Sequence, residues 1–137
     1  MTKYKLKIND AIYLRSNVLM GITDYPTIEV NYQSSQILNE LEKIHEKFVE
    51  EQRKLMKKFG EKMHEKSQEY TVKDLQGADK EKYQSAVKDV LKSEIELSFS
   101  FNLIESIMKT PNFKAEGEGQ STLYSLLFQI LTKSEVK

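Results

Sequence analysis

Apolar residues recur every three or four positions through the middle of the chain, on a highly charged background. They form one column: Ile37, Leu41, Ile44, Phe48, Leu55, Phe59 and Met63, interrupted once at Gln52. The mean step of about 3.7 residues is closer to the period of a straight α-helix than to the 3.5-residue period of a left-handed coiled coil. The pattern therefore predicts one long amphipathic helix.

A proline gives the start of this helix. Asp24-Tyr25-Pro26 is a start signal, because proline at the first helical position gives up only an amide hydrogen that has no helical partner. A helix from Pro26 to Phe59 is about 51 Å long, whereas a compact chain of this size is roughly 37 Å across. We therefore expect the helix to extend beyond its own domain, unless Ser34 and Ser35 mark a break in it.

Two segments alternate apolar and polar residues with a period of two, which is typical of strands with one solvent-facing side. Residues 3–8 alternate lysine with Tyr4, Leu6 and Ile8, and residues 95–101 alternate apolar residues with glutamate or serine. We expect the two segments to pair. Because an isolated pair of strands is marginally stable in water, this sheet must pack against helices.

Shorter helices are expected around these elements. Asn9 or Asp10 can cap a helix that reaches Leu19 and stops at Gly21, and residues 102–109 form another that Pro111 ends. Two amphipathic helices complete the set: one capped by Asp79 with Tyr83, Val87, Val90 and Leu91 inward, and one capped by Ser121 with Leu123, Leu126, Leu127, Ile130 and Leu131. Residues 114–120, between the helix of residues 102–109 and the helix capped by Ser121, have the composition of a flexible loop.

These elements predict a mainly α fold of the α+β class, in a single helical domain spanning residues 1–137. Its centre is the long amphipathic helix in a small helical bundle, with a short two-stranded β element formed by residues 3–8 and 95–101. A chain of this length can bury one core without disulfides or metals. It contains no cysteine, which excludes disulfides and thiolate chemistry.

Charge and hydropathy limit the partners. The chain has 21 basic and 21 acidic side chains, so it has no net field to attract nucleic acid. The basic stretch Arg53–Lys62 is interleaved with glutamates, and we expect a solvated helix face there. No uninterrupted apolar run approaches the length of a membrane span, and the first residues lack the apolar stretch of a secretory signal. We expect no membrane partner and no nucleic acid.

The sequence offers few groups for catalysis. Glu42-Lys-Ile-His45 and Glu61-Lys-Met-His64 have the Glu-x-x-His spacing found in dimetal carboxylate bundles. The two copies lie on one helix about 28 Å apart, so they cannot share a metal within one chain. A small enzyme using Glu42, His45 and Tyr83 is the remaining catalytic hypothesis. We predict no enzyme activity, no cofactor and no metal site.

Several segments together carry a family resemblance. A short amino-terminal strand and helix precede a long helix with Leu41-Glu-Lys-Ile44 and the stretch Glu50–Glu61, and after a polar excursion comes Glu94-Ile-Glu-Leu97. Over about residues 1–105 this arrangement resembles a group of small uncharacterised proteins of tailed bacteriophages and prophages. The resemblance implies a viral origin and a place in the host cytoplasm or the virion, and it brings no catalytic residues.

A helix longer than its domain and strand edges with few partners favour a protein that binds other proteins. We expect a non-enzymatic phage-type structural or assembly protein, a homo-oligomer or part of a larger assembly. The alternative is a small phage-encoded inhibitor or modulator of a host enzyme of defence or transcription. The apolar residues expected to form the contact surface are Val49, Met56, Phe59, Met63, Leu123, Leu127 and Leu131.

Overall fold

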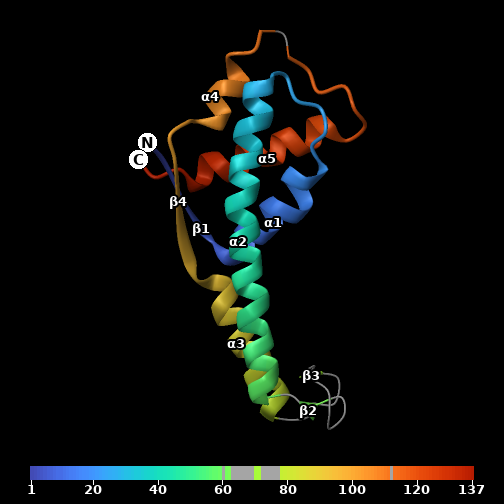
Figure 1. The fold of residues 1–137 in the computed structure, drawn as a ribbon, viewed down its shortest axis with the longest axis vertical. Coiled ribbons are helices and arrows are strands. Elements are labelled where there is room, and N and C mark those ends of the chain that lie inside the picture. Colours follow the sequence, from blue (N-terminus) through green and yellow to red (C-terminus); the bar gives the residue numbers. More distant parts are fainter. Residues whose placement is uncertain (60, 63–69, 72–77, 112) are drawn as a thin grey trace.

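The computed structural model spans residues 1–137 and describes all of them except 60, 63–69, 72–77 and 112. For residues 59, 61–62, 70–71 and 78–79 it describes the backbone only. The described chain is mainly helical with a two-stranded antiparallel sheet, so the predicted fold class is confirmed. Figure 1 shows one long helix along the whole molecule, with the sheet and the other helices gathered around it.

The long helix, α2 (Ile28–Phe59), has 32 residues and spans about 48 Å. It runs unbroken through Ser34 and Ser35, so the predicted alternative of a break at these serines is wrong. Its start is two residues later than predicted, because Thr27 caps it: the Thr27 hydroxyl oxygen accepts a hydrogen bond from the Val30 amide at 3.0 Å. The fully buried side chains of α2 lie in its first half, where Val30, Ile37 and Leu41 enter the core.

The second half of α2 extends past the sheet, but not alone. Helix α3 (Ala78–Lys92) runs beside it, so that the two form an arm at the lower end of the molecule (Figure 1). Tyr83 on α3 is buried, whereas Val87, Val90 and Leu91 are half-buried. The expected extension is therefore covered on one side by a helix of the same chain.

The sheet consists of β1 (Thr2–Lys7) and β4 (Glu94–Phe99), paired antiparallel with Tyr4 opposite Leu97. Its inner face carries Tyr4, Leu6, Leu97 and Phe99, all buried in the core. The pairing is the predicted one, but both strands begin one residue earlier than expected. Ile8 begins the next helix, and residues 100–101 lie outside β4. A second short pair joins β2 (Glu61–Lys62) to β3 (Tyr70–Thr71).

The helix expected after β1 is divided into three short pieces. They are α1 (Ile8–Tyr13), a π-helical turn η1 (Leu14–Val18) and a 3-10 turn η2 (Leu19–Gly21). The strand runs straight into α1, and Lys7 stands at its cap position, so Asn9 and Asp10 are helical residues rather than caps. The wider π turn still places Leu14 and Val18 fully inside the core.

The last two helices close the core. Helix α4 (Leu103–Met108) is capped by Asn102, whose side-chain oxygen accepts from the Glu105 amide at 3.1 Å. Helix α5 (Gln120–Ser134) crosses behind α2 (Figure 1) and begins after Gly119, whose φ of 74° is a left-handed conformation that favours glycine. The predicted cap Ser121 therefore lies inside the helix.

The two ends of the chain lie together. After α5 the Val136 amide donates to the Lys3 carbonyl at 2.9 Å, and Glu135 lies opposite Tyr4. This contact places the carboxyl-terminal residues against the edge of β1 that faces away from β4.

Candidate functional site

One edge of the sheet is open. β1 has β4 on one side and, at Lys3 and Tyr4, residues 135–136 on the other, whereas among the described residues β4 has a partner strand on one side only. Within the part of the chain that the structure describes, no backbone hydrogen bond joins residues 94–99 to any segment other than β1. The second edge of β4 therefore keeps unpaired N–H and C=O groups, which are the groups through which a sheet accepts another strand.

The positions of these groups follow from two hydrogen bonds. In an antiparallel pair, opposite residues either exchange backbone hydrogen bonds or direct their N–H and C=O groups away from each other, in alternation. Lys3 lies opposite Ser98 and gives its carbonyl oxygen to Val136 on the far side, so this pair is of the second kind. At the other end of the strand pair, the Ile8 amide donates to the Ser93 carbonyl at 2.9 Å. Ile8 and Ser93 are therefore of the first kind, which agrees with the same alternation. Glu94, Glu96 and Ser98 therefore direct their backbone groups to the open edge.

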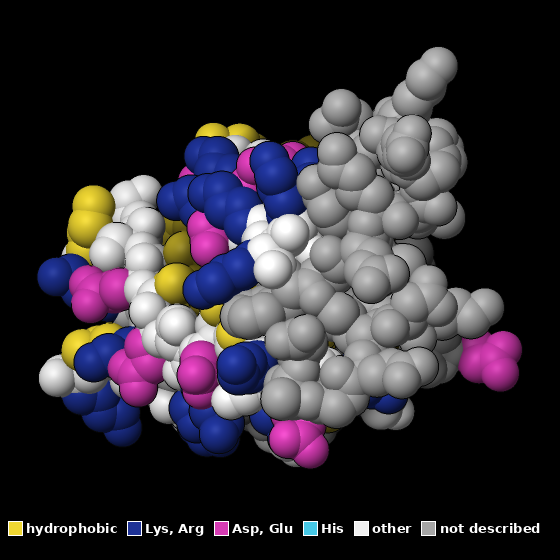
Figure 2. Space-filling view, turned by 90° about the horizontal axis from the view of Figure 1, so that it is seen from below, with side chains coloured by type: hydrophobic (Ala, Val, Ile, Leu, Met, Phe, Trp, Pro, Cys, Tyr) yellow, Lys and Arg dark blue, Asp and Glu magenta, His cyan; other side chains and the backbone are white. Residues whose placement is uncertain are grey.

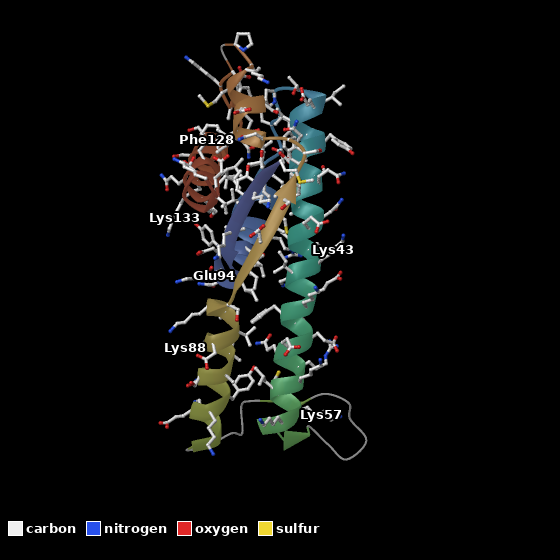
Figure 3. All side chains as sticks on the ribbon, turned by 90° about the vertical axis from the view of Figure 1, so that its left-hand side faces the viewer. Lys43, Lys57, Lys88, Glu94, Phe128 and Lys133 are labelled. Carbon is white, nitrogen blue, oxygen red and sulfur yellow. The ribbon has the colours of Figure 1, made fainter. Side chains whose placement is uncertain are left out.

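A groove of about 640 Å³ lies between β4 and α2. Ile44, Ile95 and Leu97 supply its apolar side chains. In Figure 3 β4 lies between β1 and α2, with Glu94 at the lower end of the strand and Lys43 on the neighbouring helix. The groove thus runs beside the strand edge that has no partner.

Acidic side chains outnumber basic ones along this groove. Its charged lining residues are Glu40, Lys43, Glu46, Lys47, Glu50 and Glu96. Lys43 is held by Glu40 on its own helix, at 3.0 Å between Nζ and Oε1. On the paired side of β4, Lys3 and Lys5 of β1 bind Glu96 at 3.9 Å and Glu94 at 3.2 Å, so the two strands join through alternating opposite charges.

A second hollow, of about 750 Å³, lies between α4, the segment after it and α5. It is lined mainly by apolar side chains, among them Ile107, Met108, Phe113, Tyr124 and Phe128. The Tyr124 hydroxyl is already used, since it donates to the Asp24 carbonyl at 2.6 Å. Met108 is 73% exposed at the rim. This hollow has apolar walls without a strand edge beside it.

The residues expected to form a contact surface divide into three groups. Val49 and Met56 are half-buried on the second half of α2, and Leu123 is half-buried on α5. Leu127 and Leu131 are 0% and 1% exposed in the core, because α5 turns this face toward η1 and β1, so the folded chain does not offer them to a partner. The Phe59 side chain and Met63 lie outside the described residues.

Of the residues of the catalytic hypothesis, Glu42 is held in an ion pair within the fold, and His45 is half-buried on α2. The Arg15 guanidinium of η1 forms a two-pronged ion pair with Glu42, with Nε 2.5 Å from Oε2 and Nη2 3.0 Å from Oε1. This hydrogen bonding lowers the pKa of Glu42. Tyr83 is buried on α3, and Glu61 and His64 fall in the segment whose side chains are not described. Among the described residues, no three His, Cys, Asp or Glu side chains are grouped so that they could hold a metal ion.

The surface of the lower end is mixed in charge. Figure 2 shows lysine and arginine side chains interspersed with aspartate and glutamate over the coloured part of this face. Ion pairs one turn apart on α2 join Arg53 to Glu50 at 3.9 Å and Lys54 to Glu51 at 3.5 Å. The basic stretch of α2 therefore shares its surface with acidic partners. No described helix combines the length and the apolar character needed to cross a membrane.

Sequence reasoning identified the strand that carries the open edge, but not the groove beside it. The alternation in Glu94-Ile-Glu-Leu97 gives the strand and its inner face. Which edge stays unpaired depends on where α2 and the carboxyl-terminal residues lie, and no local pattern contains that information.

Comparison of the chain with protein-family models, with curated proteins and with solved structures finds no match.

Proposed function

We propose that this chain is a non-enzymatic structural or assembly protein of the tailed-phage type, which binds another protein through the open edge of β4. One observation carries the proposal: the outward backbone groups of Glu94, Glu96 and Ser98 have no backbone partner among the described residues, and they lie beside a groove with apolar side chains. Strand addition to such an edge is a common way for proteins to bind one another, because main-chain hydrogen bonds supply affinity and side-chain pockets supply selectivity.

The arrangement of the rest of the molecule supports a binding role. Residues 135–136 cover part of the sheet's other edge, at Lys3 and Tyr4 of β1, which leaves the edge of β4 as the more open one. The arm of α2 and α3 extends past the sheet, and Lys47 and Glu50 of its α2 part line the groove. The resemblance over about residues 1–105 supports the phage setting, with the host cytoplasm or the virion as the expected location.

Affinity capture tests this function with a matched control. The tagged chain and its Glu96→Pro variant are used as bait in lysates of phage-infected and uninfected bacteria. Proline at an outward-facing edge position removes the N–H donor while the paired side of the strand is kept. We expect a phage protein to be retained by the natural chain and lost with the variant, and mass spectrometry identifies it.

Two results would contradict the proposal. One is a monodisperse monomer by light scattering that retains nothing from infected cells. The other is a captured protein that Glu96→Pro retains equally well. Retention of a host enzyme from uninfected cells would instead favour the inhibitor hypothesis, because a virion subunit binds mainly itself or other viral proteins.

A further inference from the structure

We infer that the open edge of β4 accepts an extended segment of a partner protein in which basic residues alternate with apolar ones. This inference rests on the proposed function and names the chemistry of the partner. It follows from three properties of the site: the direction of the β4 backbone groups, the apolar side of the groove, and the sign of its charges.

The backbone fixes the register of the added strand. Glu94, Glu96 and Ser98 direct their N–H and C=O groups outward, so an added strand forms its hydrogen bonds with these three residues. Side chains opposite Glu94 and Glu96 then lie on the solvent-facing side of the sheet, where both glutamates are exposed. Side chains opposite Ile95 and Leu97 lie on the other side, toward Ile44 in the groove.

The charges select basic residues for the solvent-facing positions. The solvent-facing side chains of an added strand lie opposite Glu94 and Glu96, which on their other side pair with Lys5 and Lys3 of β1. Opposite charges on facing strands stabilise a sheet, whereas like charges directly opposite destabilise it. β1 shows the result within this chain, because its lysines and buried Tyr4 and Leu6 alternate along the other edge of β4.

The same charges argue against a second copy as the occupant. If two copies joined β4 to β4 in antiparallel fashion, centred on Ile95 or on Glu96, a glutamate of one copy would face a glutamate of the other. The outer edge of β1 in a second copy is partly covered, because residues 135–136 pair with it at Lys3 and Tyr4. A lysine-containing strand from a different protein satisfies both the hydrogen bonds and the charges.

A labelled peptide tests the inference on the full chain. The probe has the sequence of residues 2–8, that is β1 and Ile8, acetyl-Thr-Lys-Tyr-Lys-Leu-Lys-Ile-amide, and binding is followed by fluorescence anisotropy. A control peptide has its three lysines replaced by glutamate. We expect saturable binding of the lysine peptide that is at least about tenfold tighter than that of the control. Binding should weaken between about 0.1 M and 1 M salt, since the Debye length falls from about 10 Å to about 3 Å.

Two changes locate the peptide at the edge of β4. Glu96→Pro should weaken binding about tenfold through the loss of main-chain hydrogen bonding, whereas Glu96→Gln, which keeps the N–H, should weaken it only about twofold. Because the proline variant can disturb folding, peptides N-methylated at alternate residues give a second measurement on the natural chain. Methylation of the amides that face β4 should abolish binding, and methylation of the other set should leave it unchanged.

The outcomes separate the inference from the proposed function. Equal binding of the lysine and glutamate peptides, or binding that neither methylated set reduces, would overturn the inferred chemistry. A dimer of the chain alone that Glu96→Pro dissociates would overturn it as well, since the occupant would be a second copy. If capture from infected cells still depends on Glu96 while the peptide fails to bind, the function stands and the strand chemistry is wrong.

Discussion

Gln120 holds the turn at Gly21 from the far end of the chain. Its side-chain nitrogen donates to the Gly21 carbonyl oxygen at 3.0 Å, and its side-chain oxygen accepts from the Thr23 and Asp24 amides at 2.9 and 3.2 Å. One buried amide group therefore satisfies three backbone groups in the connection between η2 and α2. The first residue of α5 thus sets the path of the chain into the long helix.

Replacement of Gln120 by alanine should lower the free energy of unfolding by about 2 kcal/mol, because three backbone groups lose their partner in a site with limited access to water. Urea unfolding followed by circular dichroism measures the change. Gln129→Ala is the matched control, since Gln129 is exposed on the same helix. Equal effects of the two substitutions would show that the contacts of Gln120 contribute nothing beyond helix propensity.

The raised pKa of Tyr124 should make the free energy of unfolding fall at high pH. Burial raises its pKa from 10.0 to about 12, with further contributions from the charges of Tyr25 and Asp24. The unfolded chain loses this proton near pH 10 and the folded chain only near pH 12, so the contribution is complete below pH 10 and is lost as the pH rises from 10 to 12. Tyr124→Phe should make the decline in unfolding free energy across this range shallower.

The measurement is urea unfolding at several pH values between 9 and 11.5, a range chosen around the raised pKa of about 12. Exposed Tyr32 supplies the control substitution, Tyr32→Phe. At neutral pH Tyr124→Phe should cost about 1 kcal/mol, because the Asp24 carbonyl loses the donor that binds it at 2.6 Å. A decline between pH 10 and 11.5 that is as steep in Tyr124→Phe as in the natural chain would contradict the assignment.

The predictable parts of the fold are the elements whose apolar residues repeat with a regular local period. The 3.7-residue column located α2, and the period of two located β1 and β4 and their inner faces, because burial on one side of an element leaves its period in the sequence. Serine occurs both inside helices and at their ends, so Ser34 and Ser35 were compatible with a break in the helix and with an unbroken helix.

The parts that were not predictable depend on contacts between distant segments. Thr27 replaces the expected start of α2, and Gly119 replaces Ser121 as the residue before α5, since the path of each connection decides where helical hydrogen bonds begin. The groove beside β4 exists because α2 passes the sheet on the side where β4 has no partner strand. Leu127 and Leu131 have the same spacing whether they face a partner or the core, so sequence alone could not separate these environments.

Protonation of Glu42 should lower the free energy of unfolding at acid pH. Its pKa is lowered below the ordinary value of 4.5, chiefly by its hydrogen bonds to Arg15. A lowered pKa in the folded state gives a contribution that is present above pH 4.5 and is lost as the pH falls through the folded-state pKa. Glu42→Gln should therefore reduce stability at neutral pH and have little effect at the lowest pH.

Unfolding free energies between pH 2.5 and 7, on both sides of the ordinary value of 4.5, measure this effect. Exposed Glu46, one turn along the same helix, gives the control Glu46→Gln. The difference between Glu42→Gln and the natural chain should shrink steadily below pH 4.5. A difference that is constant over the whole range would mean that the substitution acts through packing rather than through charge.

Substitutions of Leu127 and Val49 should have different effects on stability and on partner binding. Leu127 is fully buried, so Leu127→Ala removes packed methyl groups, leaves a cavity and should cost about 2–5 kcal/mol of unfolding free energy. Val49 is half-buried on the arm, and Val49→Ala should cost less than about 1 kcal/mol of unfolding free energy.

If the second half of α2 contacts the partner, Val49→Ala will weaken capture of that partner while the chain stays folded. Leu127→Ala will instead lower capture only in proportion to the unfolded fraction. Thermal unfolding and capture are measured on the same samples for this reason. A Val49 variant that is as stable and captures as well as the natural chain would confine the contact to the edge of β4.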